Sequence, residues 1–102
     1  MNYYLKNIPE RELKPRDNGI TMVMDKGLSI RQCEDLIESS GKYIDFIKLG
    51  WSTSYLTENL KEKIKIFRDA NIAVYFGGTL FEVFLIRDQL DDYLKKIGRA
   101  HV

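Results

Sequence analysis

Lysine, carboxylate and hydroxyl side chains gather in three short glycine-containing segments, and each segment directly follows or ends an apolar run. These segments are residues 25–27, 48–54 and 77–82. Ammonium groups attract anions and donate protons, carboxylates ligate metal ions, and hydroxyls with backbone N–H groups hold anionic oxygens. The three segments could therefore bind and activate an anionic substrate.

Lys48 is the sharpest candidate because it stands in an otherwise apolar strand. A desolvated ammonium there is costly unless it meets an anion or a carboxylate. A strand-end ion pair with Asp25 or Glu82 explains the position equally well. Lys26, beside Asp25, fits a solvated turn as well as a site.

The sequence Gly77-Gly78-Thr79 precedes a predicted helix and could present backbone N–H groups and a hydroxyl to an anion. A tight turn is the more ordinary interpretation. Glu82, one turn into that helix, could ligate Mg²⁺ or favour the helix start. Trp51 could line a ligand site, although packing on a neighbouring loop explains it better.

The composition is that of a globular protein of 102 residues, with 44% apolar and 30% charged side chains. A net charge of +1 gives no overall field that would favour nucleic acid or an anionic membrane as partner. The single Cys33 excludes an internal disulfide and fits a reducing compartment, and no apolar run approaches the roughly 18 residues of a membrane span. We therefore expect a soluble protein of the cytoplasm.

Periodicity predicts strands over residues 20–24, 43–49 and 72–76, with helices between and after them. Ser29 caps the first predicted helix and Gly41 ends it, residues 50–54 form a loop, Thr57 caps the second helix, and two short helices cover residues 80–86 and 88–96. In the second helix, Leu60, Ile64 and Phe67 recur at the spacing of a stripe that covers a sheet.

Strands about 25 residues apart with helical crossovers run parallel, so the fold class is α/β with parallel (β/α) units. An open three-stranded sheet would expose one apolar face, whereas a TIM barrel needs about 250 residues. We expect about three of the eight units of such a barrel. Residues 1–18 are predicted to form an N-terminal arm with solvated Lys14 and Arg16, residues 19–96 the partial barrel, and residues 97–102 a translated sequencing adapter without function.

Four segments in this order resemble the phosphosulfolactate synthase family, which serves coenzyme M biosynthesis. They are Lys14-Pro15-Arg16, Met24-Asp25-Lys26-Gly27-Leu28, Tyr43-Ile44-Asp45-Phe46-Ile47-Lys48-Leu49-Gly50-Trp51 and Tyr75-Phe76-Gly77-Gly78-Thr79-Leu80-Phe81-Glu82. The resemblance covers residues 14–96. Ser52 departs from the family, which usually has glycine there, and this puts the loop's backbone angles in doubt.

The resemblance implies an Mg²⁺-dependent addition of sulfite to phosphoenolpyruvate, with no nucleic-acid or membrane partner and with self-association of the full-length protein left open. It implies catalytic roles for Lys26 and Lys48 and a metal ligand in Glu82. It further implies substrate contacts from Asp25, Thr53, Ser54, Gly77, Gly78 and Thr79. The fragment by itself is expected to be inactive, because many barrels hold phosphate with loops after later strands.

Three alternatives stay open at this point, one of them a small binding module, which the open edges of the predicted sheet weigh against. A heat-stress-associated branch similar to the family would make the protein a non-enzymatic relative, although retention of Lys26 and Lys48 weighs against it. Another phosphate-binding TIM-barrel lyase would place different chemistry on the same rim.

Overall fold

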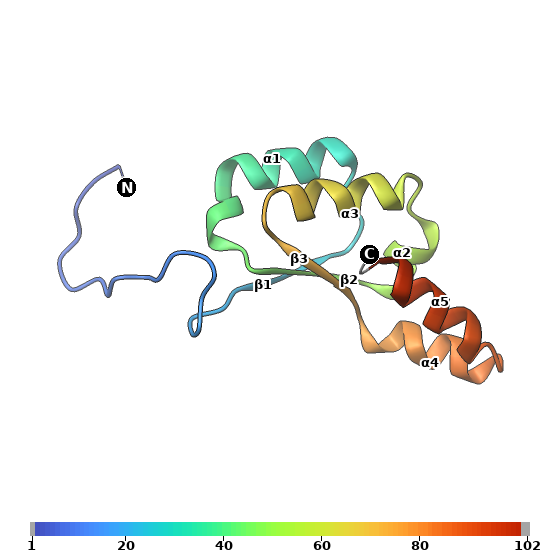
Figure 1. Cartoon of the computed structure of the whole chain (residues 1–102). Helices are drawn as coiled ribbons and strands as arrows, with labels where there is room; N and C mark the ends of the chain where they lie inside the picture. Colours follow the sequence, from blue (N-terminus) through green and yellow to red (C-terminus); the bar gives the residue numbers. More distant parts are fainter. Residues whose placement is uncertain (1, 101–102) are drawn as a thin grey trace.

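The computed structural model of the chain describes residues 2–100, with side chains for residues 2–96. Three strands form one parallel sheet in the order β1-β2-β3 (Figure 1). The elements are β1 (Met22–Asp25), α1 (Ile30–Ser40), the 3₁₀ helix η1 (Gly41–Tyr43), β2 (Phe46–Leu49), α2 (Trp51–Leu56), α3 (Leu60–Asp69), β3 (Ala73–Phe76), α4 (Gly78–Ile86) and α5 (Leu90–Ala100). The α/β class with parallel units is therefore confirmed, and closure into a barrel stays a prediction.

Alternation along the strands divides the sheet into two unlike faces, because successive side chains point to opposite sides. On one face, residues such as Ile47, Leu49 and Val74 are buried. Helices α1 and α3 pack together over this face (Figure 1). The core of the molecule therefore lies between the sheet and these two helices.

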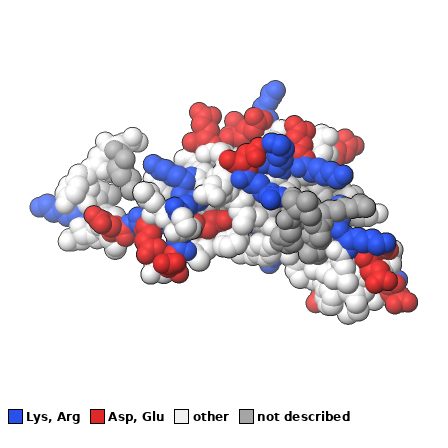
Figure 2. All heavy atoms as spheres, in the orientation of Figure 1, with Lys and Arg blue, Asp and Glu red and all other residues white. Residues whose placement is uncertain are grey.

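The first helix begins as the sequence predicts. The Ser29 side chain accepts a hydrogen bond from the Gln32 amide, and the Gln32 side chain accepts one from the Ser29 amide, which satisfies two N–H groups at the helix start. Cys33, four residues after the cap, is fully buried. The outer sides of α1 and α3 carry side chains of both charges, which gather along the top of Figure 2.

The other face of the sheet is open, as expected for an uncovered parallel sheet. Met22, Met24 and Phe46 are 46%, 44% and 37% exposed there, and the rings of Phe46 and Tyr75 pack edge to face. Lys48 shares this face, since it pairs in register with Met24 and Tyr75. Apolar side chains therefore surround the stem of Lys48.

Residues 51–54 belong to helix α2, which Gly50 precedes as its cap, so the predicted loop over residues 50–54 is wrong. Serine and threonine favour helices weakly on their own, but Thr53 and Ser54 are both buried here, and tertiary packing overrides the local preference. Thr57 ends α2 through its N–H bond to the Thr53 carbonyl, and the next helix begins after Asn59 in a left-handed conformation. The predicted helix cap at Thr57 is therefore also wrong.

The N-terminal arm lies beside the sheet, at the left of Figure 1, and leads into β1. Lys14 Nζ donates to the carbonyls of Gly41 and Asn71, each at 3.0 Å. The Arg16 side chain is 2% exposed and contacts Asp45 Oδ1 at 2.6 Å. The expectation that both cations are solvated is wrong, because backbone carbonyls before β2 and β3 need donors that the sheet ladder does not supply.

Helix α5 continues to Ala100, beyond the end that the sequence predicted at Lys96. Residues 97–102 are predicted to be a translated adapter sequence. The side chains of residues 97–100, and His101 and Val102 as a whole, lie outside the described part of the chain. Among the described residues, none of the helices is long and apolar enough to cross a membrane.

Candidate functional site

The three chemistry-bearing segments follow strands that end on the same edge of the sheet. Asp25, Leu49 and Phe76 end the strands, with Asp25 opposite Leu49 and Leu49 opposite Phe76. Parallel α/β sheets keep their ligand sites at this edge, beyond the carboxyl ends of the strands. Each predicted site segment therefore lies at one common rim.

Asp25 is fully buried and both of its carboxylate oxygens have partners within the chain. Oδ1 accepts from the amides of Gly27 and Leu28 at 2.8 Å each. Oδ2 lies 2.6 Å from Lys63 Nζ, and neither of these two buried atoms has another polar partner among the described residues. Contact between Asp25 and a substrate, as expected from the sequence, would require one of these partners to move.

Lys63 is the residue that sequence reasoning missed. It is fully buried on the inner side of α3, within the same stripe as Leu60, Ile64 and Phe67. The signal was present: position 63 falls at the i+3 place of that stripe, where an apolar residue is expected. A lysine at a core position requires a buried carboxylate, and Asp25 is that carboxylate.

Cys33, on the buried side of α1, is close enough to Lys63 and Asp25 for their charges to act on its thiol. Burial raises the pKa of its thiol to about 11, with Lys63 acting in the opposite direction and Asp25 adding to the rise. The thiol is therefore protonated at neutral pH, and it acts as a small apolar side chain of the core.

Lys48 is half-buried, and its stem runs alongside Gly77. A Cβ added at Gly77 would lie 3.0 Å from Lys48 Cε. Among the described residues, Lys48 forms no ion pair with Asp25 or with Glu82, although both were sequence-based alternatives. The structure thus brings Lys48 and Gly77 together, and it leaves the ammonium without a carboxylate from this part of the chain.

The start of α4 presents backbone N–H groups, as the sequence Gly77-Gly78-Thr79 predicts, although the Gly77 amide is not among them. The Gly77 amide is used by the sheet, since it donates to the Leu49 carbonyl at 3.0 Å, and the helix begins at the next residue. Gly78 and Thr79 are exposed in the first turn, where N–H groups have no partner within the helix. These two amides and the Thr79 hydroxyl are available to an anion.

Thr53 and Ser54 lie side by side in α2, and both are buried. Ser54 Oγ donates its only proton to the Trp51 carbonyl at 2.9 Å. The Ser54 hydroxyl must therefore rotate before it can donate to an anionic oxygen. Thr53 packs near the start of its own helix, with its Oγ1 3.7 Å from the position a Cβ would take at Gly50.

Lys26 and Glu82 are both exposed, Lys26 on the turn after β1 and Glu82 in the second turn of α4. The structure does not bring them into an ion pair with each other or with Lys48 among the described residues. Within the described part of the chain, no group of three metal-binding side chains gathers around Glu82 or elsewhere. Glu82 therefore has no second metal-binding group beside it among the described residues.

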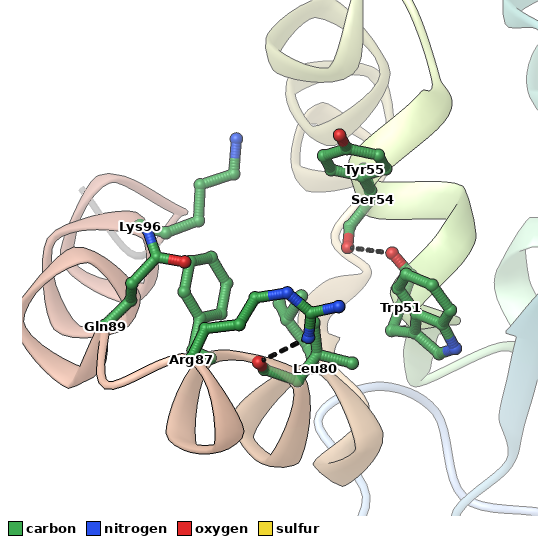
Figure 3. A pocket seen from close by; sticks show the side chains of 9 residues that line it. Trp51, Ser54, Tyr55, Leu80, Arg87, Gln89 and Lys96 are labelled. Carbon is green, nitrogen blue, oxygen red and sulfur yellow. Dashed lines mark hydrogen bonds between the residues drawn. The ribbon is translucent and has the colours of Figure 1, made fainter.

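A cleft of about 580 Å³ opens between α2 and the pair α4 and α5 (Figure 3). Aromatic and aliphatic side chains form its walls, and its charged groups are two cations. The lining residues are Trp51, Ser54, Tyr55, Leu80, Val83, Phe84, Arg87, Gln89 and Lys96. Arg87 extends across the cleft toward the helix that carries Trp51 and Ser54, while Nη1 also donates to the Val83 carbonyl at 3.0 Å. The cleft favours a small anion with some apolar surface.

Comparison with known proteins gives one consistent result. The sequence model of the (2R)-phospho-3-sulfolactate synthase family matches residues 9–102. The chain is 43% identical over 98 residues to a phosphosulfolactate synthase of Methanothermobacter thermautotrophicus, covering 94% of this chain and 38% of the relative. It is 38% identical over 93 residues to one of Bacillus subtilis (91% and 37%), and 44% identical over 80 residues to one of Methanocaldococcus jannaschii (76% and 32%). The chain thus spans about a third of the length of these relatives.

Proposed function

Since the chain belongs to the (2R)-phospho-3-sulfolactate synthase family, we propose that it supplies the first part of an active site that adds sulfite to phosphoenolpyruvate. The observation that carries this proposal is the family match over residues 9–102. Because the relatives are much longer, turnover is proposed for a protein of their length, and the chain alone is expected to be inactive. Its substrates are small molecules, and we keep the cytoplasm as the proposed compartment.

The proposed reaction joins two anions and builds up further negative charge. The sulfur lone pair of sulfite forms a bond to C3 of phosphoenolpyruvate, the C2–C3 π electrons move toward C2 and its carboxylate, and a proton is delivered to C2. Such a step needs fixed positive charge near the carboxylate and a proton donor near C2. The rim must therefore provide cations that do not depend on solvent.

We assign these tasks to Lys48 and Lys26. Lys48 suits charge stabilisation because it is half-buried, its stem is held beside Gly77, and it has no carboxylate partner among the described residues. A cation in such surroundings acts more strongly on a bound anion than one in water. Lys26 is exposed on the turn after β1 and can approach a substrate from the neighbouring strand. Either lysine could deliver the proton to C2.

The first turn of α4 and the hydroxyls of α2 complete the proposed anion contacts. The exposed amides of Gly78 and Thr79 favour an anionic oxygen, helped by the positive end of the helix dipole. Thr53 and Ser54 stay candidates, the latter after rotation away from the Trp51 carbonyl. The neighbouring cleft, with Arg87 at its wall, would attract the same anions toward the rim.

Mg²⁺ stays part of the proposal for the longer protein. Glu82 is an exposed carboxylate near the start of α4, and the described residues do not gather a metal site around it. Mg²⁺ in proteins keeps several waters and often takes only one or two carboxylates together with substrate oxygens. We therefore propose Glu82 as one ligand and derive no step through the metal.

We also propose that the sheet is part of a (β/α)₈ barrel. Helix α1 connects β1 to β2 and helix α3 leads into β3, and both helices lie on the same face of the sheet. A (β/α)₈ barrel likewise has all its helices on the outer face of its sheet. The open face would then line the barrel interior, with Lys48 among Met24 and Tyr75. Further strands would cover the exposed apolar side chains that this face carries.

The proposal is tested with a chimera in which residues 9–96 of this chain replace the matching part of the Methanothermobacter thermautotrophicus relative. The chimera and its parent are assayed for sulfite-dependent loss of phosphoenolpyruvate, with Mg²⁺ and after chelation, and phosphosulfolactate is identified by ³¹P NMR. We expect product only when sulfite is present. A folded chimera that leaves phosphoenolpyruvate unchanged, beside an active parent, would contradict the proposal and favour a non-enzymatic role or another substrate.

A further inference from the structure

The turn after β1 depends on one buried carboxylate. Asp25 Oδ1 accepts both the Gly27 amide and the Leu28 amide at 2.8 Å, so the backbone folds back over its side chain. Gly27 adopts a φ of +134°, a conformation that other residues rarely take. The direction in which Lys26 leaves the sheet is therefore set by the orientation of this carboxylate.

The orientation of the carboxylate is in turn set by helix α3. Lys63 Nζ lies 2.6 Å from Oδ2, and both side chains are fully buried. A carboxylate can rotate about its last bond unless both oxygens are engaged, and here the ammonium engages one while the turn engages the other. The contacts run from Lys63 through Asp25 to the consecutive amides of Gly27 and Leu28 in the turn.

Stability alone does not require this arrangement. A buried ion pair can often be replaced by apolar side chains of similar volume without loss of stability, because removing two charges from water costs about as much as their attraction returns. The geometry it imposes is less easily replaced, since no apolar pair accepts two amides. This points to a role in placing the turn, beyond holding α3 against the sheet.

We propose that Lys63 is a positioning residue for Lys26: by holding Asp25 Oδ2, it keeps Oδ1 aimed at the Gly27 and Leu28 amides and so fixes the turn that carries Lys26 to the rim. The expected effect on catalysis rests on the proposed synthase activity. The expected effect on the conformation of the turn does not, and it can be measured on the chain itself.

The test compares amide hydrogen exchange in Lys63→Met and in a matched control, Lys65→Met. Lys65 lies on the same helix and also makes a 2.6 Å ion pair, with Asp69, but its side chain is 74% exposed. Exchange at Gly27 and Leu28 is expressed relative to the Cys33 amide, which is bonded to the Ser29 carbonyl at the start of α1. This ratio cancels a general loss of stability.

In Lys63→Met we expect Gly27 and Leu28 to exchange about tenfold faster or more relative to Cys33, because the turn opens locally. In Lys65→Met the ratio should stay within about twofold of the unaltered chain. An unchanged ratio in Lys63→Met, or an equal rise in both variants, would overturn the proposal.

The single variant leaves a buried carboxylate uncompensated and could unfold the chain. The double variant Asp25→Asn with Lys63→Met removes both charges and keeps the volume. It should fold and still show the faster relative exchange, because no ammonium then directs the side-chain oxygen to the turn. A folded double variant with the original ratio would contradict the positioning role.

Activity of the chimera supplies the functional arm of the test. With Lys63→Met we expect kcat to fall while the Lys65→Met chimera keeps it, because Lys26 is displaced in one variant only. If exchange at the turn rises in Lys63→Met but the unaltered chimera is inactive beside an active parent, the proposed function fails and the positioning role stands. If the turn is unaffected and activity is intact, the positioning role fails alone.

Discussion

The stem of Lys48 passes so close to Gly77 that a single added carbon would touch it. A Cβ at Gly77 would lie 3.0 Å from Lys48 Cε and 3.5 Å from the Leu49 carbonyl oxygen. Gly78, the next residue, has no atom within 4 Å of its corresponding position. Two adjacent glycines therefore differ in function: the first makes room for the lysine stem, and the second marks the exposed helix start.

Alanine at Gly77 should move the Lys48 ammonium with little effect on the fold. The backbone of Gly77 has a φ of −69°, which alanine adopts readily, and the nearest atom belongs to the far end of a flexible side chain. We expect Gly77→Ala to change the free energy of unfolding by less than about 1 kcal/mol. In the chimera it should lower kcat/KM by about 10- to 100-fold, because a small displacement of a catalytic group is costly.

Gly78→Ala is the matched control for this prediction. It adds the same methyl group one residue later, into open space. Alanine keeps the backbone amide through which Gly78 is proposed to contact the anion. The free energy of unfolding in denaturant and kcat/KM should therefore both stay close to those of the unaltered protein. Equal losses of activity at the two glycines would show that the helix start, and not the Lys48 stem, is what alanine disturbs.

Removal of either rim lysine should abolish turnover and leave the fold intact. In the chimera we expect Lys26→Ala and Lys48→Ala to lower kcat/KM by about 100-fold or more, the range for loss of a catalytic proton donor or charge. Thermal unfolding should be little changed, because neither ammonium forms an ion pair among the described residues. Lys65→Ala serves as the control, and normal kinetics in either rim variant would remove that lysine from the site.

The strands and the first helix could be predicted because their signals are local. Alternating burial along β2 follows directly from the order of Ile47, Lys48 and Leu49, and Ser29 caps α1 through side chains three residues apart. Position 48 stood out for the same reason, as a charge within an apolar run. Local patterns thus identify which residues lie near a rim.

The remaining features depend on partners far apart in the chain. Asp25 and Lys63 are separated by most of two strand–helix units, so their pairing required the parallel register of the sheet. Arg16 and Lys14 donate mainly to backbone carbonyls, and every residue has such a carbonyl, so the sequence does not identify these partners. Helix α2 forms from residues of weak helix preference because Thr53 and Ser54 are buried, which local propensity does not reveal.

The arm should detach from the sheet when Asp45 loses its charge. The Thr21 amide donates to its carboxylate at 2.8 Å and the Arg16 guanidinium pairs with it, and these contacts lower the pKa of Asp45 although burial opposes them. Because the folded-state pKa is below the usual 3.8, this contribution to stability is present above that pH and is lost as the pH falls through the lowered value.

Limited trypsin digestion checks the same contact at neutral pH. Asp45→Asn should speed cleavage after Arg16 several-fold, because an uncharged amide holds the guanidinium less tightly. Asp69→Asn removes the carboxylate of an exposed ion pair and should leave that cleavage rate unchanged. Equal rates in the unaltered chain and in Asp45→Asn would mean that the contacts of Lys14 and Arg16 with backbone carbonyls hold the arm without the Asp45 charge.

Phosphoenolpyruvate should change the fluorescence of Trp51, the single tryptophan of the chain. Trp51 lines the cleft across from Arg87, so an anion entering there alters the surroundings of the indole. We expect a saturable change, with Kd raised about tenfold in Arg87→Gln through loss of a charged donor. Lys95→Gln, which alters a cation outside the lining, should not shift Kd. A change reproduced by sodium chloride at equal ionic strength would speak against binding.

Alkaline pH should destabilise the fold through Cys33. Burial raises the pKa of this thiol from 9.0 to about 11, so the unfolded chain releases the proton at lower pH than the folded one. The contribution of the protonated thiol to the free energy of unfolding is therefore fully present below pH 9. It is lost as the pH rises toward 11, and the loss is roughly 2 to 3 kcal/mol at most. Urea unfolding of the unaltered chain and of Cys33→Ala across this range isolates the effect, since lysines and tyrosines titrate in both. The difference in unfolding free energy between the two proteins should shrink as the pH rises; a constant difference would mean that the thiol is equally acidic in the folded and unfolded chain.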